Sequence, residues 1–406
     1  LADQHIWLAS DDGINKIDYN SPFRYWGELH GLKGKINDIA NFKGTTYLLT
    51  NSGIYYFAHD KLKKIKGNIS SAWRFLVLET ANNDSAFLVV HSRGIFEIRN
   101  NEVFPVGYSK YAFRSCQHPT IEAHFYVAHI DSLTLYQYTS DTIHLMKTYQ
   151  QVKNVNKLIQ GYDNDVWAGS YDGAVYRIKN DSAFRFDREE GLPDAKVFEI
   201  HSLDSTILAS CQHGLFYYDE NKNQFLAYKN LNSPLLGKNS YILQIHKDNN
   251  KRVWFLMDDG DKKYIQIFHD QDDSLINSYT KQFNRFKRMN ISFIRPGRDS
   301  GMWIATNTGL IEYKHNENDH TPGCPSAYIR KVTCGLDSVI YMGADTPGKF
   351  NLPVLGCHDN IISFEYACPF FTEEQETLYS YQLKGYIDEW SDWSEMTTKE
   401  YVNLPH

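Results

Sequence analysis

The chain has 406 residues, of which 42% are hydrophobic and 15% aromatic, so it can bury a large core and is not expected to be disordered. Its formal net charge of −7 comes without a basic stripe, which argues against nucleic acid as a partner. No run of 18 apolar residues occurs, so no segment of this sequence is expected to cross a membrane.

One hairpin pattern recurs along the whole chain. Its first copy is IWLASDDGINKI (residues 6–17), in which an apolar run meets polar residues and a glycine and then resumes with alternating apolar positions. The glycine provides the positive φ that the turn requires. The turns of the successive copies fall at positions 13, 53, 94, 133, 173, 214, 260 and 309, which are 40, 41, 39, 40, 41, 46 and 49 residues apart. The fourth copy carries Leu133 in place of the glycine.

Further apolar runs lie between the hairpins and predict two more strands in each unit. They include INDIANF (residues 36–42), WRFLVL (73–78), VFEIHSL (197–203), YILQIHK (241–247) and ISFIRP (291–296). A repeat of about 40 to 45 residues with four short antiparallel strands is typical of a β-propeller blade. The sequence therefore predicts an all-β fold that is built around a propeller.

The number and completeness of the repeats predict the domains. Seven full units follow the incomplete first copy, which predicts a seven-bladed β-propeller over residues 31–322, with an eight-bladed ring as the alternative. Residues 1–30 are interpreted as the tail of a preceding propeller or as strands that close this ring. A cluster of Pro, Gly and Asn after residue 315 marks a boundary, and residues 323–406 form a second domain.

The six cysteines fit no zinc-binding spacing. Cys334 and Cys368 could form a disulfide in an oxidising compartment, whereas buried free thiols are the alternative. The sequence CQH occurs twice, at residues 116–118 and 211–213, but only the second copy falls at a hairpin turn. We therefore predict no metal site and no cofactor.

The end of the chain carries its most specific local pattern. YSYQLKGYIDEW (residues 379–390), followed by Tyr401 and the sequence NLP (403–405), resembles the triple-tyrosine domain, an immunoglobulin-like β-sandwich. The upstream units, with WIATNTGLIEY (303–313) as the clearest copy, are similar to the regulator-propeller repeats that precede this domain in a family of bacterial sensors. The family pattern continues beyond the position of His406, so the sandwich is expected to be partial.

This resemblance implies a function. It implies the ligand-sensing region of a membrane-bound signal-transduction regulator, on the periplasmic side of the inner membrane, with a transmembrane helix outside this sequence. The output would be a cytoplasmic histidine kinase or a DNA-binding module, the ligand an oligosaccharide, and the signalling form a homodimer. No kinase or helix-turn-helix motif is present, so this region is expected to be no enzyme and to bind no nucleic acid. The alternatives are a propeller glycosidase or lyase and a non-catalytic protein-interaction scaffold.

Aromatic residues that share a repeat position are expected in the core. The tryptophans at the start of the hairpins should fill the space between blades; they are Trp7, Trp167, Trp254 and Trp303. In the second domain, the residues expected in the core are Tyr379, Tyr381 and Trp390. Trp393 lies in a polar stretch and is expected to be exposed.

The candidate ligand site follows from the propeller geometry. The loops that lead into the inner strands and the turns of the middle hairpins should open onto one face, although they lie about 40 residues apart in sequence. Flat rings and convergent polar groups of this kind suit an oligosaccharide, and the cations suit an acidic one. The candidate residues are Lys35, Asn37, Trp73, Arg74, Arg93, Arg114, Asn156, Tyr171, Asp172, Lys196, His213, Asn239, Tyr241, Arg288 and Asn290.

Overall fold

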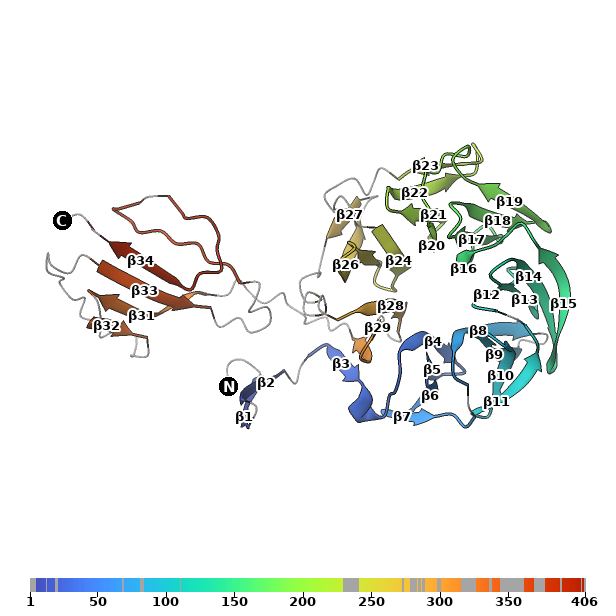
Figure 1. The fold of residues 1–406 in the computed structure, drawn as a ribbon, viewed down its shortest axis with the longest axis horizontal. Helices are drawn as coiled ribbons and strands as arrows, with labels where there is room; N and C mark the ends of the chain where they lie inside the picture. The colour runs from blue at the N-terminus through green and yellow to red at the C-terminus, as the bar shows by residue number, and fades with distance from the viewer. Residues whose placement is uncertain are drawn as a thin grey trace. The chain divides into compact units, whose positions relative to one another are not determined.

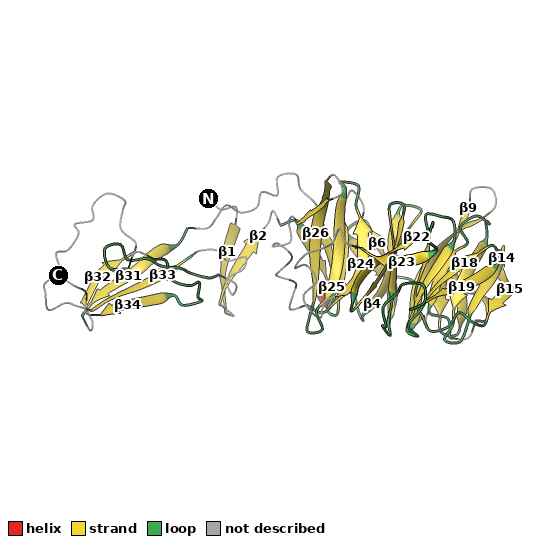
Figure 2. Ribbon diagram, turned by 90° about the horizontal axis from the view of Figure 1, so that it is seen from above, coloured by secondary structure: helices red, strands yellow, loops and turns green. Residues whose placement is uncertain are grey.

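The structure is a computed structural model, and it describes most of the chain. The residues outside the described part are 1–4, 12, 19–20, 68, 81–83, 110, 229–240, 272–273, 278–282, 284–285, 287–288, 298–300, 315–325, 336–337, 344–360, 369–376, 388, 403 and 405–406. The described residues form strands and loops, with one 3₁₀ turn at Glu28–His30 and no α-helix among them (Figure 2). The chain divides into two compact units, Leu1–Asp319 and His320–His406.

The first unit contains seven four-stranded antiparallel sheets, which Figure 1 shows arranged as the blades of a propeller. We number the blades in chain order. The first three blades are β4–β7 (Ile36–Phe42, Thr45–Thr50, Gly53–Ala58, Lys61–Lys64), β8–β11 (Ala72–Thr80, Asp84–His91, Gly94–Arg99, Glu102–Gly107) and β12–β15 (Arg114–Gln117, His124–Ala128, Leu133–Thr139, Thr142–Tyr149).

The next three blades continue this order. They are β16–β19 (Val155–Gln160, Val166–Ser170, Val175–Lys179, Ser182–Phe186), β20–β23 (Glu199–Leu203, Thr206–Cys211, Gly214–Asp219, Gln224–Ala227) and β24–β27 (Tyr241–Lys247, Arg252–Asp258, Lys263–Gln271, Ser274–Asn277). The sequence therefore predicted the fold class and the inner strands well, since β4, β24 and β28 have the predicted bounds.

The seventh blade joins the two ends of the ring. It consists of β28 (Ile291–Pro296), β29 (Met302–Thr306), β30 (Leu310–Tyr313) and, as its outer strand, β3 (Phe23–Trp26). The inner strand β28 contacts β4 of blade 1, which closes the circle. The predicted propeller start at residue 31 left out β3. Of the two roles considered for residues 1–30, ring closure applies to β3, whereas β1 (His5–Ser10) and β2 (Gly13–Asp18) form a separate two-stranded sheet.

The predicted hairpin turns all connect the second and third strands of a blade or, at position 13, β1 and β2. Gly94 shows why glycine recurs there. Its φ is 156°, and a Cβ atom at this position would lie 2.6 Å from the carbonyl oxygen of Gly107. Leu133 begins β14 without a glycine, so the fourth copy forms its hairpin through a different turn.

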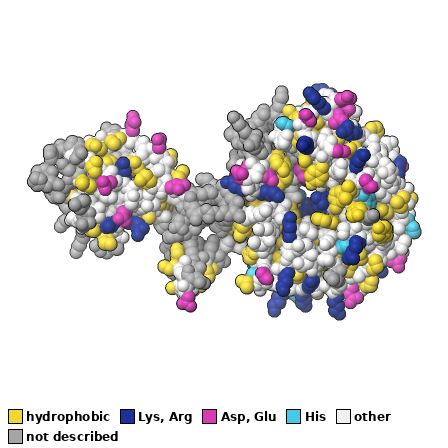
Figure 3. All heavy atoms as spheres, viewed as in Figure 1, with side chains coloured by type: hydrophobic (Ala, Val, Ile, Leu, Met, Phe, Trp, Pro, Cys, Tyr) yellow, Lys and Arg dark blue, Asp and Glu magenta, His cyan; other side chains and the backbone are white. Residues whose placement is uncertain are grey.

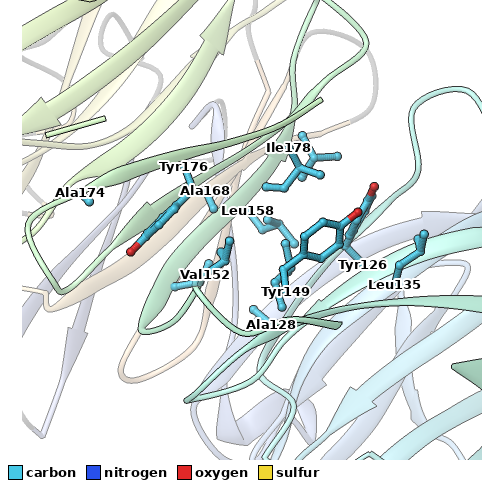
Figure 4. Packing of buried hydrophobic residues seen from close by; sticks show 13 residues of the cluster. Tyr126, Ala128, Leu135, Tyr149, Val152, Leu158, Ala168, Ala174, Tyr176 and Ile178 are labelled. Atoms are coloured by element: carbon cyan, nitrogen blue, oxygen red, sulfur yellow. The ribbon is translucent and has the colours of Figure 1, made fainter. Parts of the chain in front are cut away.

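The core of the propeller lies between neighbouring blades. Figure 4 shows one such layer, in which Tyr126, Leu135 and Tyr149 of blade 3 pack with Tyr176 and Ile178 of blade 4. Burial of these faces removes apolar area from water, at about 25 cal/mol per Å². Each blade is therefore stabilised mainly by the blades on its two sides.

The tryptophans at the start of the hairpins were predicted to be buried between the blades. Trp167, Trp254 and Trp303 are buried, as predicted. The prediction for Trp7 is wrong, because its side chain is 48% exposed. The reason is that β1 and β2 form a two-stranded sheet, in which apolar side chains such as Ile14 stay exposed on a strand pair that is not part of a blade.

The second unit contains a four-stranded sheet in the order β32-β31-β33-β34. Its strands are β31 (Tyr328–Cys334), β32 (Ser338–Met342), β33 (Ile361–Ala367) and β34 (Thr398–Val402). Tyr379 and Tyr381 contact this sheet, with ring centroids 5.1 Å from Tyr366 and 6.5 Å from Tyr401, respectively, but both are half-buried, so their core prediction is met only in part. Trp393 is 71% exposed, as predicted, but Trp390 is 67% exposed and its core prediction is wrong. Trp390 lies beyond the turn at residues 384–386 and outside the strands of the sheet.

The cysteine pair proposed as a disulfide is not bonded. Neither Cys334 nor Cys368 forms a disulfide. Strands β31 and β33 pair Cys334 with Ile362 and Tyr328 with Ala367, so the two thiols lie at opposite ends of the strand pair. This separation is about 20 Å along a strand, whereas a disulfide needs Cα atoms within about 7 Å. Cys324 and Cys357 lie outside the described residues.

Candidate functional site at the centre of the propeller

Five of the seven inner strands begin with a β-bulge. The register shifts lie between Ile36/Asp38, Ala72/Arg74, Val155/Lys157, Ile242/Gln244 and Ile291/Phe293. A bulge adds one residue to the strand and turns the following side chain in a new direction. Three candidate residues from the sequence, Asn37, Trp73 and Asn156, are the added residues of such bulges.

The loops that lead into the inner strands lie beside the hairpin turns. Their backbones are hydrogen-bonded, for example from Tyr111 N to Ser92 O (2.9 Å) and from Gly173 N to Lys196 O (3.2 Å). Similar bonds join Asn51 to Lys35 and Tyr171 to Asn154. Entry loops and hairpin turns therefore lie together at one end of the blades.

Asp38 connects three inner strands at the centre. Its Oδ1 accepts hydrogen bonds from Arg74 Nη1 of β8 at 3.1 Å and from Arg295 Nη2 of β28 at 3.3 Å. Its Oδ2 accepts the backbone N–H of Phe75 at 3.0 Å. Asp38 is almost completely buried, so the two arginines share one carboxylate.

A second set of contacts connects the inner strands of blades 3, 4 and 5. Arg114 Nε of β12 donates to the carbonyl oxygen of Asn156 on β16 at 2.6 Å. Asn156 Nδ2 in turn donates to Glu199 Oε1 of β20 at 3.2 Å. The bulge at Asn156 makes this possible, because it turns the amide toward the neighbouring blade.

Lys157 begins a buried hydrogen-bond chain. The hydroxyl of Ser210 donates to Ile242 O at 2.6 Å, so it must accept from His201 Nε2, 2.9 Å away. His201 Nδ1 is then the acceptor for Lys157 Nζ at 3.1 Å. Burial, together with the charge of Lys157, holds the pKa of His201 well below its usual value. His201 is therefore neutral, and Lys157 carries the charge at this point.

Cations outnumber carboxylates at the centre. The inner strands supply Arg74, Arg114, Lys157 and Arg295 against Asp38 and Glu199. Burial lowers the pKa of Arg114 to about 10, with a further contribution from Arg74. Burial likewise lowers the pKa of Lys157 to about 8, although Glu199 opposes this. Burial raises the pKa of Glu199, against the attraction of Lys157 and Arg114. These groups are poorly hydrated and electrostatically coupled across several blades.

Aromatic side chains accompany the charged groups. Tyr171, in the hairpin turn of blade 4, is close enough to Arg114 to affect its pKa, and its side chain is 58% exposed. Burial raises the pKa of Tyr241, at the start of β24, and the charges of Asp258, Glu199 and Tyr171 add to this. Trp73, in the bulge of β8, is 44% exposed. Figure 3 shows a hollow at the centre of the ring, with Lys and Arg side chains beside it.

Two cavities lie at the same end of the blades. The larger has a volume of about 800 Å³. Besides Tyr171, its lining includes four carboxylates and three cations: Asp172, Asp187, Glu189, Asp194, Arg185, Arg188 and Lys196. The smaller, of about 330 Å³, includes Asn290 and Lys263 in its lining. Because Tyr171 belongs to the larger cavity and also affects Arg114, this cavity is close to the charged centre.

The structure divides the predicted site residues into four groups, apart from Trp73, which lies in the bulge of β8. The residues brought together at or beside the centre are Arg74, Arg114, Asn156, Tyr171 and Tyr241. Asn37 bonds to the neighbouring blade through Ala72 O, Asp172 and Lys196 line the larger cavity, and Asn290 lines the smaller.

The remaining candidates contribute less to the centre. Lys35 and Arg93 are exposed on their loops. His213 bonds through Nε2 to Asp194 O, beside the larger cavity. Asp172 also accepts the hydroxyls of Ser170 and Tyr176, so it stabilises its own turn. Asn239 and Arg288 lie outside the described residues.

Sequence reasoning missed four charged residues of the centre. They are Asp38, Lys157, Glu199 and Arg295. Asp38 and Lys157 each follow the added residue of a bulge, and Glu199 is the first residue of β20. All three therefore lie one to three residues after the candidates that were chosen from the entry loops. An ionisable residue inside an otherwise apolar inner strand was the signal that could have identified them.

Comparison with known proteins places this fold. No family model and no curated protein matches the sequence. The extracellular domain of a protein assigned as a hybrid two-component system from B. thetaiotaomicron matches with a TM-score of 0.70 at 16% identity, over 99% of this chain and 56% of that one. The extracellular domain of a one-component system from the same organism matches with a TM-score of 0.57 at 13% identity, over 100% and 58%.

A streptogramin B lyase matches less well, with a TM-score of 0.51 at 12% identity, over 71% of this chain and 96% of the lyase. The chain thus has the propeller-containing fold of sensor extracellular domains and spans a little over half the length of the two sensor domains compared. Among the described residues, no group of three His, Cys, Asp or Glu side chains could hold a metal ion.

No helix among the described residues is long and apolar enough to cross a membrane.

Proposed function

We propose that this chain is the ligand-sensing region, outside the cytoplasm, of a membrane-bound signal-transduction regulator, and that its propeller binds an oligosaccharide over the centre of the ring. The observation that carries the proposal is the convergence of polar and aromatic side chains from different blades: Arg74, Arg114, Asn156, Glu199 and Tyr241. Such a mixture of convergent polar groups and flat rings is what sugar recognition uses. The likeness to sensor extracellular domains supports the signalling role.

The proposal assigns binding and no catalysis to this region. Glycoside hydrolysis needs one carboxylate to act as an acid and another to act as a base or nucleophile. Asp38 is fully engaged by two arginines and a backbone N–H, and Glu199 is held by Asn156. Signal transfer would pass through the second unit to a transmembrane helix outside this sequence and to a cytoplasmic kinase or DNA-binding output, with a homodimer as the active form.

Ligand binding to the folded chain tests the proposal. A panel of neutral and acidic oligosaccharides is screened for an increase in melting temperature, because a ligand that binds only the folded state must stabilise it. A binding sugar is then measured by calorimetry on the wild type and on the double variant Trp73→Ala/Arg114→Ala. We expect the variant to lose binding while it keeps its fold by circular dichroism. A steady release of reducing ends would instead identify an enzyme, and unchanged affinity in the variant would remove this face as the site.

A further inference from the structure

The centre of the propeller has more positive charge than its own carboxylates neutralise. Charges that are partly removed from water in a protein are normally paired, because desolvating an ion is costly. Among the described residues, four half-buried cations from four blades face two carboxylates. One of these carboxylates, Asp38, already serves Arg74 and Arg295 and has no further oxygen to offer, since its second oxygen accepts the N–H of Phe75.

The donors of these cations are only partly used by the described residues. Arg114 donates through Nε to Asn156 O and through Nη1 to Phe113 O, which leaves its Nη2 group without a described protein acceptor. Lys157 donates one N–H to His201. Arg74 and Arg295 each bond through a single terminal nitrogen to Asp38. Unused guanidinium and ammonium donors in a poorly hydrated place are a binding site for an oxyanion.

Resting on the proposed function, we propose that the centre of the ring is an anion site, which binds a carboxylate or sulfate group carried by an acidic oligosaccharide. Arg114 and Lys157 are its principal contacts, and Arg74 adds to the positive electrostatic potential at the site. A carboxylate has the planar geometry that an arginine terminal edge matches. The charge of the anion offsets the surplus of cations that the protein leaves uncompensated.

The surroundings favour a sugar whose acidic group lies at the centre, because carboxylates outnumber cations in the lining of the cavity beside it, which suits neutral sugar rings. Tyr171 is exposed beside Arg114 and lines the cavity of about 800 Å³, which is large enough for further sugar rings. Trp73, exposed in the bulge that precedes Arg74, offers a second ring face. A sugar bound by its acidic group at the centre could therefore extend over Tyr171 toward Lys196, which also lines the cavity.

Matched ligands separate charge recognition from sugar recognition. The 406-residue chain is titrated by calorimetry with tetragalacturonate, with its methyl ester, which has the same rings without charge, and with a chondroitin sulfate disaccharide. Sodium sulfate at low millimolar concentration, against sodium chloride of equal ionic strength, probes the anion site without a sugar. We expect at least one acidic sugar to bind about ten-fold or more tightly than the ester, corresponding to about 1.4 kcal/mol, with affinity that falls as salt rises. We also expect sulfate to raise the melting temperature.

Substitutions locate the effect. Arg114→Gln should remove the sulfate-dependent increase in melting temperature and lower the affinity for the acidic sugar by about ten-fold or more. Arg74→Gln provides a second variant if Arg114→Gln does not fold. Lys222→Gln removes an exposed cation from the connection between β22 and β23, which is not part of the candidate site, and should behave as the wild type.

Three outcomes decide between the two proposals. Equal affinity for the acid and its ester would overturn the anion site and leave the oligosaccharide proposal intact. Stabilisation by sulfate that depends on Arg114, without binding of any sugar, would support the anion site and contradict the oligosaccharide proposal. A folded Arg114→Gln protein that responds to sulfate as the wild type does would overturn the anion site directly.

Discussion

The propeller holds buried and half-buried cations, and the two kinds are compensated differently. Between blades 4 and 5, Arg177 donates to Asp165 Oδ2 at 2.6 Å and to Asp163 Oδ2 at 3.1 Å, and its guanidinium lies 5.0 Å from the ring of Trp167. At the centre, Arg74 and Arg295 share one carboxylate. A fully matched cation stabilises a fold, whereas a poorly matched one raises the energy of the free protein and suits a ligand of opposite charge.

The origin of the partners explains this difference. Asp163, Asp165 and Arg177 come from one blade, so the main part of their geometry is set when a single sheet forms. Tyr218 and Glu220 of blade 5 add further acceptors for Arg177. Arg252 repeats the arrangement in blade 6, where it bonds to Asp248 Oδ2 at 2.7 Å. The central cations instead come from separate blades and meet only when the ring closes. We therefore expect substitutions in the two regions to have different effects.

Removal of the matched cation should have the largest effect. Arg177→Met leaves Asp163 and Asp165 buried without their partner and should lower the free energy of unfolding by about 3–5 kcal/mol. Urea denaturation measures the loss. Lys179→Met serves as the control, because Lys179 lies 3.8 Å from Asp165 but is more exposed, and it should change stability by less than about 1 kcal/mol. Equal effects of the two variants would contradict the comparison.

The pH dependence of Lys157 comes next. Its pKa is lowered from 10.5 to about 8, so between these pH values the unfolded chain binds the proton and the folded chain does not. The group therefore makes the free energy of unfolding rise with pH between about 8 and 10.5. Below this window it lowers the free energy of unfolding by an amount that no longer changes with pH. Lys157→Met should remove that rise, which amounts to about 2–3 kcal/mol at most. Denaturation curves of both proteins from pH 7 to 10.5 measure it, and parallel pH profiles would show that Lys157 is not destabilised by burial.

Substitution of Asp38 tests the charge balance at the centre. Asp38→Asn leaves Arg74 and Arg295 facing each other without their carboxylate and should destabilise the protein by about 2 kcal/mol. Because the centre then has greater surplus charge, sulfate should restore more stability to this variant than to the wild type. A second substitution, Arg74→Met, should recover part of the loss. If the double variant is no more stable than the single one, repulsion between the arginines is not the cause.

The smallest effect is expected for an ion pair whose carboxylate is exposed to water. Lys247 Nζ lies 2.7 Å from Asp204 Oδ2, where water screens the exposed carboxylate. Lys247→Met should alter the free energy of unfolding by less than about 1 kcal/mol. The effect of this variant is the baseline with which the effects at Arg177, Lys157 and Asp38 are compared. If Lys247→Met lowers the free energy of unfolding by several kcal/mol, the proposed difference between exposed and less exposed ion pairs is wrong.

Periodicity in the sequence predicted most of the fold, because strands with a repeated spacing must repeat their environment. It located the inner strands β4, β24 and β28 and the buried Trp167, Trp254 and Trp303. It failed for Trp7, since the same local pattern lies there in a two-stranded sheet outside the blades. A local pattern specifies a hairpin but not the neighbours that bury it.

The site was predictable only in part, for a similar reason. Arg74 and Arg114 were found because they stand at the entry to inner strands. Lys157 and Glu199 were not, since a bulge or the exact start of a strand decides which side chain turns toward the centre. The surplus of cations is a property of several blades together, which a pattern along one strand does not contain.

The pairing of β3 with β30 has a mechanical consequence. The chain enters the ring at Phe23 and leaves it at Tyr313, which face each other in the sheet, and Lys314 N donates to Pro22 O at 2.8 Å just outside. Tension applied between the segments before and after the propeller is therefore carried by adjacent atoms and bypasses the other six blades. Because the two strands are antiparallel and loaded at the same end, such tension would unzip them one hydrogen bond at a time, and the seventh blade would open before any other.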